Sequence, residues 1–227
     1  MTGAVVLVNP NTSPTTTRMM TTLARRALAG TGLRVRGVTA ARGPAMLTDP
    51  EALRAAAPEV LAAALAATAA GDCAALIVGA FGDPGIEELR AAVPQAVPVV
   101  GLGEAALTEA AAGGRRFGIA TTTPLLAGTI AAHVERLGLG AGYTGARFTA
   151  GDPERLAARP ASLLAALEAA VRACALRDGA EAVVIGGGPL GDAADALRTR
   201  TALPVIAPIP AACRRAARLL GAGRSGA

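Results

Sequence analysis

One stretch of the sequence constrains the fold more than any other: residues 74–85, which read AALIVGAFGDPG. Its first half is apolar with no polar face, which predicts a strand buried on both faces of a parallel sheet. The stretch ends in Gly, Asp and Pro, and residues 86–93 follow with helical spacing. Residues 182–192 repeat this design of strand, Gly/Pro turn and helix. Because ligands of open α/β sheets bind at such strand ends, the two turns predict a binding site.

Composition narrows the class of protein. Hydrophobic residues make up 52% of the 227 residues and charged residues 17%, which excludes a disordered chain and leaves room for one large or two small α/β domains. The net charge of +5 invites a nucleic-acid hypothesis, but the arginines are scattered and aromatic residues amount to only 2%. Few side chains can therefore stack on bases, and we expect no nucleic-acid partner. The sequence contains no lysine, which excludes a Schiff-base mechanism.

Targeting and cofactor signals are also missing from the sequence. The N-terminal residues have no basic region or cleavage site, and no apolar run reaches membrane-spanning length, so we expect a cytoplasmic protein with no membrane partner. Three cysteines far apart do not form a disulfide framework. No Walker motif, dinucleotide fingerprint or metal-ligand cluster is found, and we expect no cofactor and no metal.

The order of apolar runs and helical segments predicts a degenerate duplication. The expected strands are 5–8, 33–38, 74–79, 97–103, 117–120, 142–149 (a short strand or an irregular link), 182–185 and 204–207. The expected helices are 15–29, 51–70, 86–93, 104–112, 124–137, 160–177, 192–200 and 210–220. We therefore predict an α/β fold with two pseudo-symmetric lobes, each with a parallel sheet flanked by helices, and an active-site cleft between them. The lobes are 1–112 and 113–205, and 206–227 forms a C-terminal helix that packs back on the first lobe, with a disordered tail at 221–227.

Four turns should line that cleft: 9–13, 80–83, 121–123 and 186–190. They offer hydroxyl groups, the carboxamides of Asn9 and Asn11, and backbone N–H groups. Such donors suit a bound carboxylate or a developing enolate. Asn, Thr and Ser at these junctions are equally explained as helix caps.

Asp83 is the only obvious acid–base group directly at a strand end, and it is our candidate catalytic residue. The alternative explanation is a helix N-cap or an Asx turn before Pro84, positions that Asp often fills. The single histidine, His133, lies in the middle of a helical segment and is expected to be structural or on the surface. Glu104 fits the first turn of a helix, and the three cysteines fit small buried positions.

Several segments, in this order and spacing, resemble the aspartate/glutamate/hydantoin racemase superfamily, with the hydantoin racemase branch as the closest match. They are VNPNTS at 8–13, AFGDPG at 80–85, PVVGLGEAA at 98–106, GRRF at 114–117, TTT at 121–123 and GAEAVVIGG at 179–187. The resemblance implies a cofactor-independent isomerase that forms homo-oligomers. It also implies two catalytic cysteines, one per lobe: one thiolate removes the α-proton and the other thiol returns a proton on the opposite face. At the matching positions this chain has Ala80 and Gly187.

The resemblance further implies which residues hold a small carboxylate or cyclic imide. They are Asn11, Thr12, Ser13, the amides of Phe81 and Gly82, Thr121, Thr122 and the amide of Gly188. Because these residues remain, we favour an isomerase or lyase whose pocket stabilises an enolate while Asp83, a substrate group or water handles the proton. The alternative is a catalytically inactive small-molecule-binding or regulatory relative. A third interpretation, engineered removal of two cysteines, fits poorly with a glycine inside a GGGPLG turn.

Overall fold

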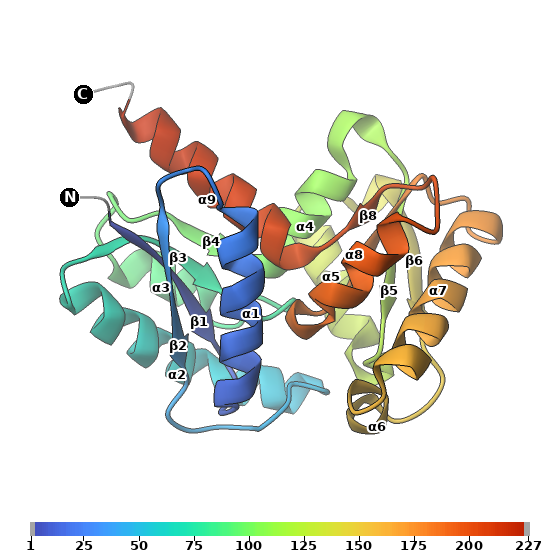
Figure 1. Ribbon diagram of the computed structural model, residues 1–227, viewed down its shortest axis with the longest axis horizontal. Coiled ribbons are helices and arrows are strands. Elements are labelled where there is room, and N and C mark those ends of the chain that lie inside the picture. Colours follow the sequence, from blue (N-terminus) through green and yellow to red (C-terminus); the bar gives the residue numbers. More distant parts are fainter. Residues whose placement is uncertain (1–2, 225–227) are drawn as a thin grey trace. The chain divides into compact units, whose positions relative to one another are not determined.

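The computed structural model describes residues 3–224, which divide into two compact units (Figure 1). The first unit combines residues up to 47, residues 51–105 and the C-terminal segment from 209. The second unit contains residues 48–50 and 106–208. The first boundary falls inside helix α4 (Leu102–Ala110), ahead of the expected residue 112, and the C-terminal helix belongs to the first unit.

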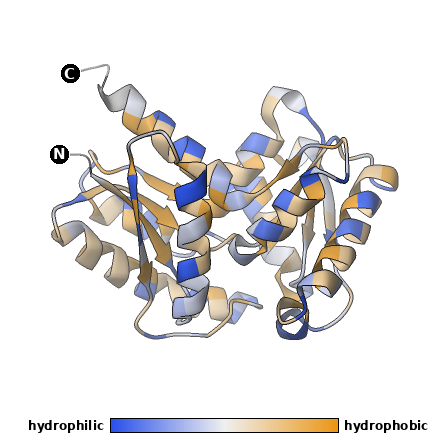
Figure 2. Ribbon diagram, viewed as in Figure 1, coloured by the Kyte–Doolittle hydropathy of each residue, from blue (hydrophilic) through white to orange (hydrophobic). Residues whose placement is uncertain are grey.

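The first unit contains a four-stranded parallel sheet. Its strands are β1 (Ala4–Asn9), β2 (Arg34–Thr39), β3 (Cys73–Val78) and β4 (Val99–Gly101). They lie in the order β2-β1-β3-β4. Every residue of β1 and the last four of β3 are buried, which explains why both read as continuous apolar runs. Figure 2 shows the same pattern as hydrophobic colouring along these strands.

Helices cover both faces of this sheet. They are α1 (Pro14–Ala27), α2 (Pro50–Ala69), α3 (Ile86–Ala92) and α9 (Pro208–Arg224). On one face, Val6 and Val78 share a hydrophobic core with Val60 of α2 and Leu89 of α3. On the other face Met20 of α1 lies beside Gly79, where a larger residue would collide. The side chains alternate between the faces as the period of a strand requires.

The second unit repeats this architecture. Its strands are β5 (Phe117–Thr121), β6 (Tyr143–Phe148), β7 (Ala182–Ile185) and β8 (Val205–Ile206). Their order β6-β5-β7-β8 matches that of the first sheet strand for strand, and all pairs are parallel. The predicted α/β fold with two parallel sheets is therefore confirmed, and residues 143–148 form a strand rather than an irregular link.

The helices of the second unit are α5 (Ala127–Arg136), α6 (Pro153–Ala157), α7 (Pro160–Leu176) and α8 (Gly191–Arg198). Ala120 and Ile185 form a core with Leu167 of α7 and Leu197 of α8. Helix α6 was not predicted. It is a five-residue helix whose N-cap Asp152 accepts a hydrogen bond from the Arg155 N–H at 2.9 Å, so a cap and a proline suffice to start it.

Two sequence expectations need correction. Helix α9 continues to Arg224, so residues 221–224 of the predicted disordered tail are helical, and residues 225–227 lie outside the described part. Helix α2 meets the length and mean hydropathy of a membrane span, contrary to the expectation that no run would. One stripe of this helix, which includes Leu53, Val60 and Ala64, is buried in the first unit, and 28% of its apolar window is buried in total.

Candidate functional site

Hydrogen bonds at the carboxyl edges of the two sheets show which positions of the two halves correspond. The Gly79 N–H donates to the Val8 carbonyl at 2.8 Å, and the Gly186 N–H donates to the Ala120 carbonyl at 2.8 Å. The Ala40 N–H donates to the Asn9 carbonyl at 3.0 Å, and the Thr149 N–H donates to the Thr121 carbonyl at 2.9 Å. The next residues after Gly79 and Gly186 are Ala80 and Gly187. The two positions at which the family pattern implies cysteines are therefore equivalent within the duplicated fold.

At the first edge, Asn9 organises the turn that leads into α1. Its Nδ2 atom donates to Asn11 Oδ1 at 2.8 Å, to the Ser13 carbonyl at 3.1 Å and to Thr17 Oγ1 at 3.0 Å. Ser13 caps α1 by accepting from the Thr16 N–H at 3.2 Å. The capping explanation of this segment is confirmed. Asn11 Oδ1 accepts from Asn9 and from the Ser13 N–H, and its Nδ2 atom takes no part in these bonds.

The turn at 80–83 presents backbone donors. The Asp83 N–H closes the turn onto the Ala80 carbonyl at 3.1 Å. Between them, the N–H groups of Phe81 and Gly82 donate to no acceptor within residues 3–224. Gly82 fits closely here, because a Cβ atom at this position would lie 2.9 Å from a Leu53 methyl group. Two adjacent donors at a strand end make a suitable cradle for an anionic oxygen.

Asp83 lies in this turn with its carboxylate already engaged. It is buried, with φ 48°, a left-handed conformation that is uncommon for a residue with a side chain. Its Oδ1 atom accepts from the Gly103 N–H at 2.9 Å and its Oδ2 atom accepts from the Glu104 N–H at 2.7 Å. Asp83 therefore caps α4, whereas helix α3, which follows it in the chain, is capped by Gly85. The capping explanation holds for a different helix than expected, and catalysis by Asp83 stays a prediction.

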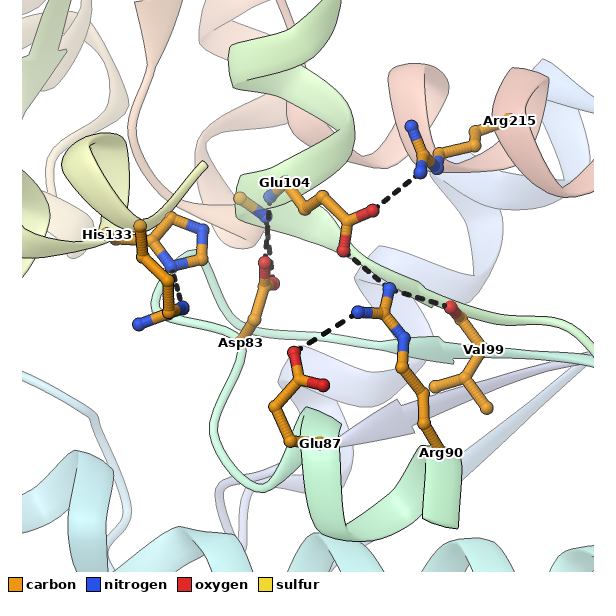
Figure 3. A network of polar contacts seen from close by, with 9 residues as sticks. Asp83, Glu87, Arg90, Val99, Glu104, His133 and Arg215 are labelled. Atoms are coloured by element: carbon orange, nitrogen blue, oxygen red, sulfur yellow. Dashed lines mark hydrogen bonds and ion pairs between the residues drawn. The ribbon is translucent and has the colours of Figure 1, made fainter. Parts of the chain in front are cut away.

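Glu104 ties this cap to two arginines (Figure 3). It lies in the first turn of α4, as predicted, and its two carboxylate oxygens accept from Arg90 at 2.5 Å and from Arg215 of α9 at 2.6 Å. Arg90 also donates to the Val99 carbonyl at 3.2 Å. The 80–83 turn, the start of α4 and the C-terminal helix thus form one polar network inside the first unit.

Gly101→Ala is expected to lower the melting temperature because the network leaves no room for a side chain at this position. A Cβ atom at Gly101 would lie 2.3 Å from the Asp83 carboxylate, so the carboxylate would have to leave its two amide donors. Thermal unfolding followed by circular dichroism checks this. Gly128→Ala in α5, where a Cβ meets nothing within 4 Å, is the matched control and should leave the melting temperature unchanged or raise it. Equal melting temperatures for Gly101→Ala and the parent would contradict the described cap.

The second edge is held by a threonine. Thr121 Oγ1 donates to the Gly186 carbonyl at 2.5 Å, which fixes the start of the Gly186–Gly188 turn. Gly187 has extended backbone, φ 160°, and a Cβ there would lie 3.1 Å from the flexible Leu190 side chain. The Gly188 N–H donates to no acceptor within residues 3–224. This edge therefore also offers a backbone donor, and it can accept a side chain at position 187.

The three cysteines lie away from both edges. Cys73 begins β3, Cys174 is buried in α7 and Cys213 is buried in α9. Burial raises the pKa of all three thiols, to about 11 for Cys174 and about 12 for Cys213. A thiol with such a pKa is protonated at neutral pH and is a poor base. None of the three replaces the missing pair.

Cys174 and Cys213 are accordingly expected to resist alkylation in the folded protein. At pH 8 the raised pKa lowers the thiolate fraction by about a hundredfold for Cys174 and about a thousandfold for Cys213, and burial blocks access further. Iodoacetamide labelling followed by mass spectrometry, with and without urea, measures this. Cys73, which is only half-buried, serves as the internal control and should react first. Rapid labelling of all three thiols without urea would contradict the assignment.

His133 lies inside the second unit. It is buried in α5, and its Nδ1 atom is hydrogen-bonded to the Arg136 guanidinium one turn later. Of the two expected roles, structural or on the surface, this burial and this contact agree with the structural one. The expected cleft shared by the two lobes stays a prediction.

Comparison with known proteins identifies the family of this chain. A family model described as Asp/Glu/hydantoin racemase matches residues 5–216, and the chain belongs to this family. It is 26% identical to a hydantoin racemase of Paenarthrobacter aurescens over 96% of this chain and 92% of that protein. Among solved structures it is similar to allantoin racemase from Klebsiella pneumoniae (TM-score 0.90, 25% identity, 97% of this chain and 89% of that one). Allantoin racemase from Pseudomonas fluorescens gives a TM-score of 0.88, also at 25% identity, over 97% of this chain and 92% of that one.

Fold and relatives together define a racemase-type enzyme of this superfamily. The strand-end turns were predicted from the sequence, whereas Arg90 and Arg215 of the polar network were not. The two arginines gave no signal, because surface arginines are scattered throughout the chain.

Proposed function

We propose that this protein is an isomerase or lyase that acts on a small carboxylate or hydantoin-like carbon acid without a pair of thiols. One observation carries the proposal: at two equivalent strand ends, backbone N–H donors remain while the cysteines that the family pattern implies are missing. The amides of Phe81 and Gly82 at one edge and of Gly188 at the other have no acceptor within residues 3–224, and they lie next to Ala80 and Gly187 in the chain. Donors of this kind stabilise an enolate oxygen, while a two-thiol proton exchange has no groups to perform it.

The chemistry of the donors favours a lyase. In decarboxylation of a malonate-type acid, the electron pair of the breaking C–C bond moves to the remaining carbonyl as an enolate, and carbon dioxide leaves. Water then protonates the enolate carbon. No protein base is needed to start this reaction, so a pocket that only stabilises the enolate suffices. Racemisation instead starts with removal of the α-proton, and the Asp83 carboxylate is already bound by two amides.

The proposal is tested with a panel of malonates, 5-substituted hydantoins and amino acids in heavy water. Carbon dioxide release or deuterium incorporation at the α-carbon, above the rate without protein, is the expected result. Each of the amide donors is worth about two to three orders of magnitude in rate in comparable oxyanion sites, so turnover should be well above background. Binding without turnover by any member of the panel would favour the inactive small-molecule-binding alternative.

Two expectations from the sequence accompany this proposal: a cytoplasmic location and a homo-oligomeric assembly. The assembly rests on the family resemblance. Light scattering coupled to size-exclusion chromatography measures it directly, because a single chain has a mass of 22.3 kDa. A mass of one chain at micromolar concentration would contradict the homo-oligomer.

A further inference from the structure

Thr149 carries a buried hydroxyl group that the fold does not use. The residue is 6% exposed and follows the last residue of β6. Its N–H continues the ladder by donating to the Thr121 carbonyl at 2.9 Å. Its Oγ1 atom, however, has no hydrogen-bond partner within residues 3–224. Buried hydroxyl groups almost always have a partner, so an exception calls for an explanation.

The fold itself does not require a hydroxyl here. The equivalent position in the first unit is Ala40, because the Ala40 N–H makes the same ladder bond to Asn9. Ala40 is also buried, so an apolar residue satisfies this position in the other half of the duplication. A valine would fill the volume of Thr149 without leaving a polar group unpaired.

The position of Thr149 links it to the candidate site. Thr121 and Phe148 form the last register pair of β5 and β6, so Thr122 and Thr149 occupy the next step at the carboxyl edge. The family resemblance implies that Thr122 binds the ligand. The Thr121 hydroxyl, also implied, already donates to the Gly186 carbonyl. Thr149 therefore carries a buried hydroxyl at this edge that has no hydrogen-bond partner within residues 3–224.

We infer that Thr149 is a ligand-binding residue, whose hydroxyl donates a hydrogen bond to an oxygen of a small carboxylate held at the carboxyl edge of β5 and β6. The inference rests on the proposed function and extends it to a residue outside the family pattern. A hydroxyl suits this task because it donates to a carboxylate oxygen and stays uncharged when the site is empty.

The test compares Thr149→Val with Thr144→Val, a matched change on the same strand. The Thr144 hydroxyl donates to the Phe117 carbonyl at 3.1 Å, so its loss should lower the melting temperature by about 2–4 °C. Thr149→Val removes an unpaired group and should leave the melting temperature unchanged or raise it. Calorimetric titration with malonate and with hydantoin should then show a dissociation constant raised about tenfold or more in Thr149→Val. Thr144→Val should bind as the parent does.

The outcomes separate the two proposals. Parent-like binding by Thr149→Val overturns the role of Thr149 and leaves the proposed function standing. If Thr149→Val has a lowered melting temperature and parent-like affinity, the ligand-binding role of Thr149 is overturned as well. The hydroxyl then stabilises the fold instead. Absence of binding by the parent protein to both probes overturns the proposed substrate class, and this inference falls with it.

Discussion

Asp83→Ala is expected to lower the free energy of unfolding by about 2–4 kcal/mol, because two buried amides of α4 lose their acceptor at once. An ordinary exposed cap is worth about 1 kcal/mol. Asp83 is 3% exposed, so water replaces its carboxylate poorly. The 80–83 turn should loosen together with α4, since one carboxylate holds both. Urea unfolding followed by circular dichroism measures the change.

Two further variants make this result specific. Asp152→Ala removes the exposed N-cap of α6 and should cost no more than about 1 kcal/mol. Asp83→Asn keeps one acceptor but turns an NH₂ group toward the second amide, so its stability should lie between those of Asp83→Ala and the parent. If Asp83 is a cap, Asp83→Asn retains the parent's turnover per folded molecule. If Asp83→Ala is as stable as the parent, the cap is not needed for stability. If Asp83→Asn is stable but loses turnover, Asp83 is the catalytic base.

The double variant Ala80→Cys/Gly187→Cys is expected to gain racemisation of 5-substituted hydantoins, at least about a hundredfold above the parent. The family pattern implies one thiol from each lobe, and the duplicated hydrogen bonds place these two residues at equivalent positions. Ala80 already has a Cβ atom, and a Cβ atom at Gly187 would contact only the flexible Leu190 side chain, at 3.1 Å. Nearby backbone N–H groups should favour the thiolate form.

Loss of optical rotation of a single enantiomer measures this gain. Ala80→Ser/Gly187→Ser is the matched control, because a hydroxyl of similar size is a far weaker acid than a thiol and should give no racemisation. Each single cysteine variant should fall well below the double variant, since racemisation needs a base on one face and an acid on the other. A folded double cysteine variant with the parent's rate would contradict the assignment of these two positions.

Much of the fold could be predicted from local sequence. β1, β3, β5 and β7 are buried on both faces, and burial of that kind leaves an apolar run that a single sequence reveals. The turns after these strands were equally visible, because Gly, Pro and hydroxyl residues interrupt the runs. The end of α9 was misjudged, since three glycines and a terminal position favour disorder, whereas residues 221–224 are helical.

The site was less predictable because its important contacts join residues far apart in the chain. Asp83 and Glu104 are separated by 21 residues, and Arg215 and Glu104 by 111. Local rules therefore assigned Asp83 to the helix that follows it, and nothing in the sequence singled out Arg215. Ala80 and Gly187 were placed by the family pattern, and the internal equivalence of the two halves supports that placement independently.

The central claim is turnover of a carbon acid without thiols, and a cysteine-free protein tests it most directly. Cys73, Cys174 and Cys213 are replaced by alanine, and carbon dioxide release and α-deuteration are measured with the panel of malonates and hydantoins at a temperature where circular dichroism shows both proteins folded. We expect turnover by the parent and the same rate per folded molecule in the cysteine-free protein. Loss of turnover in a folded cysteine-free protein, or no turnover of any panel member by the parent, would contradict it.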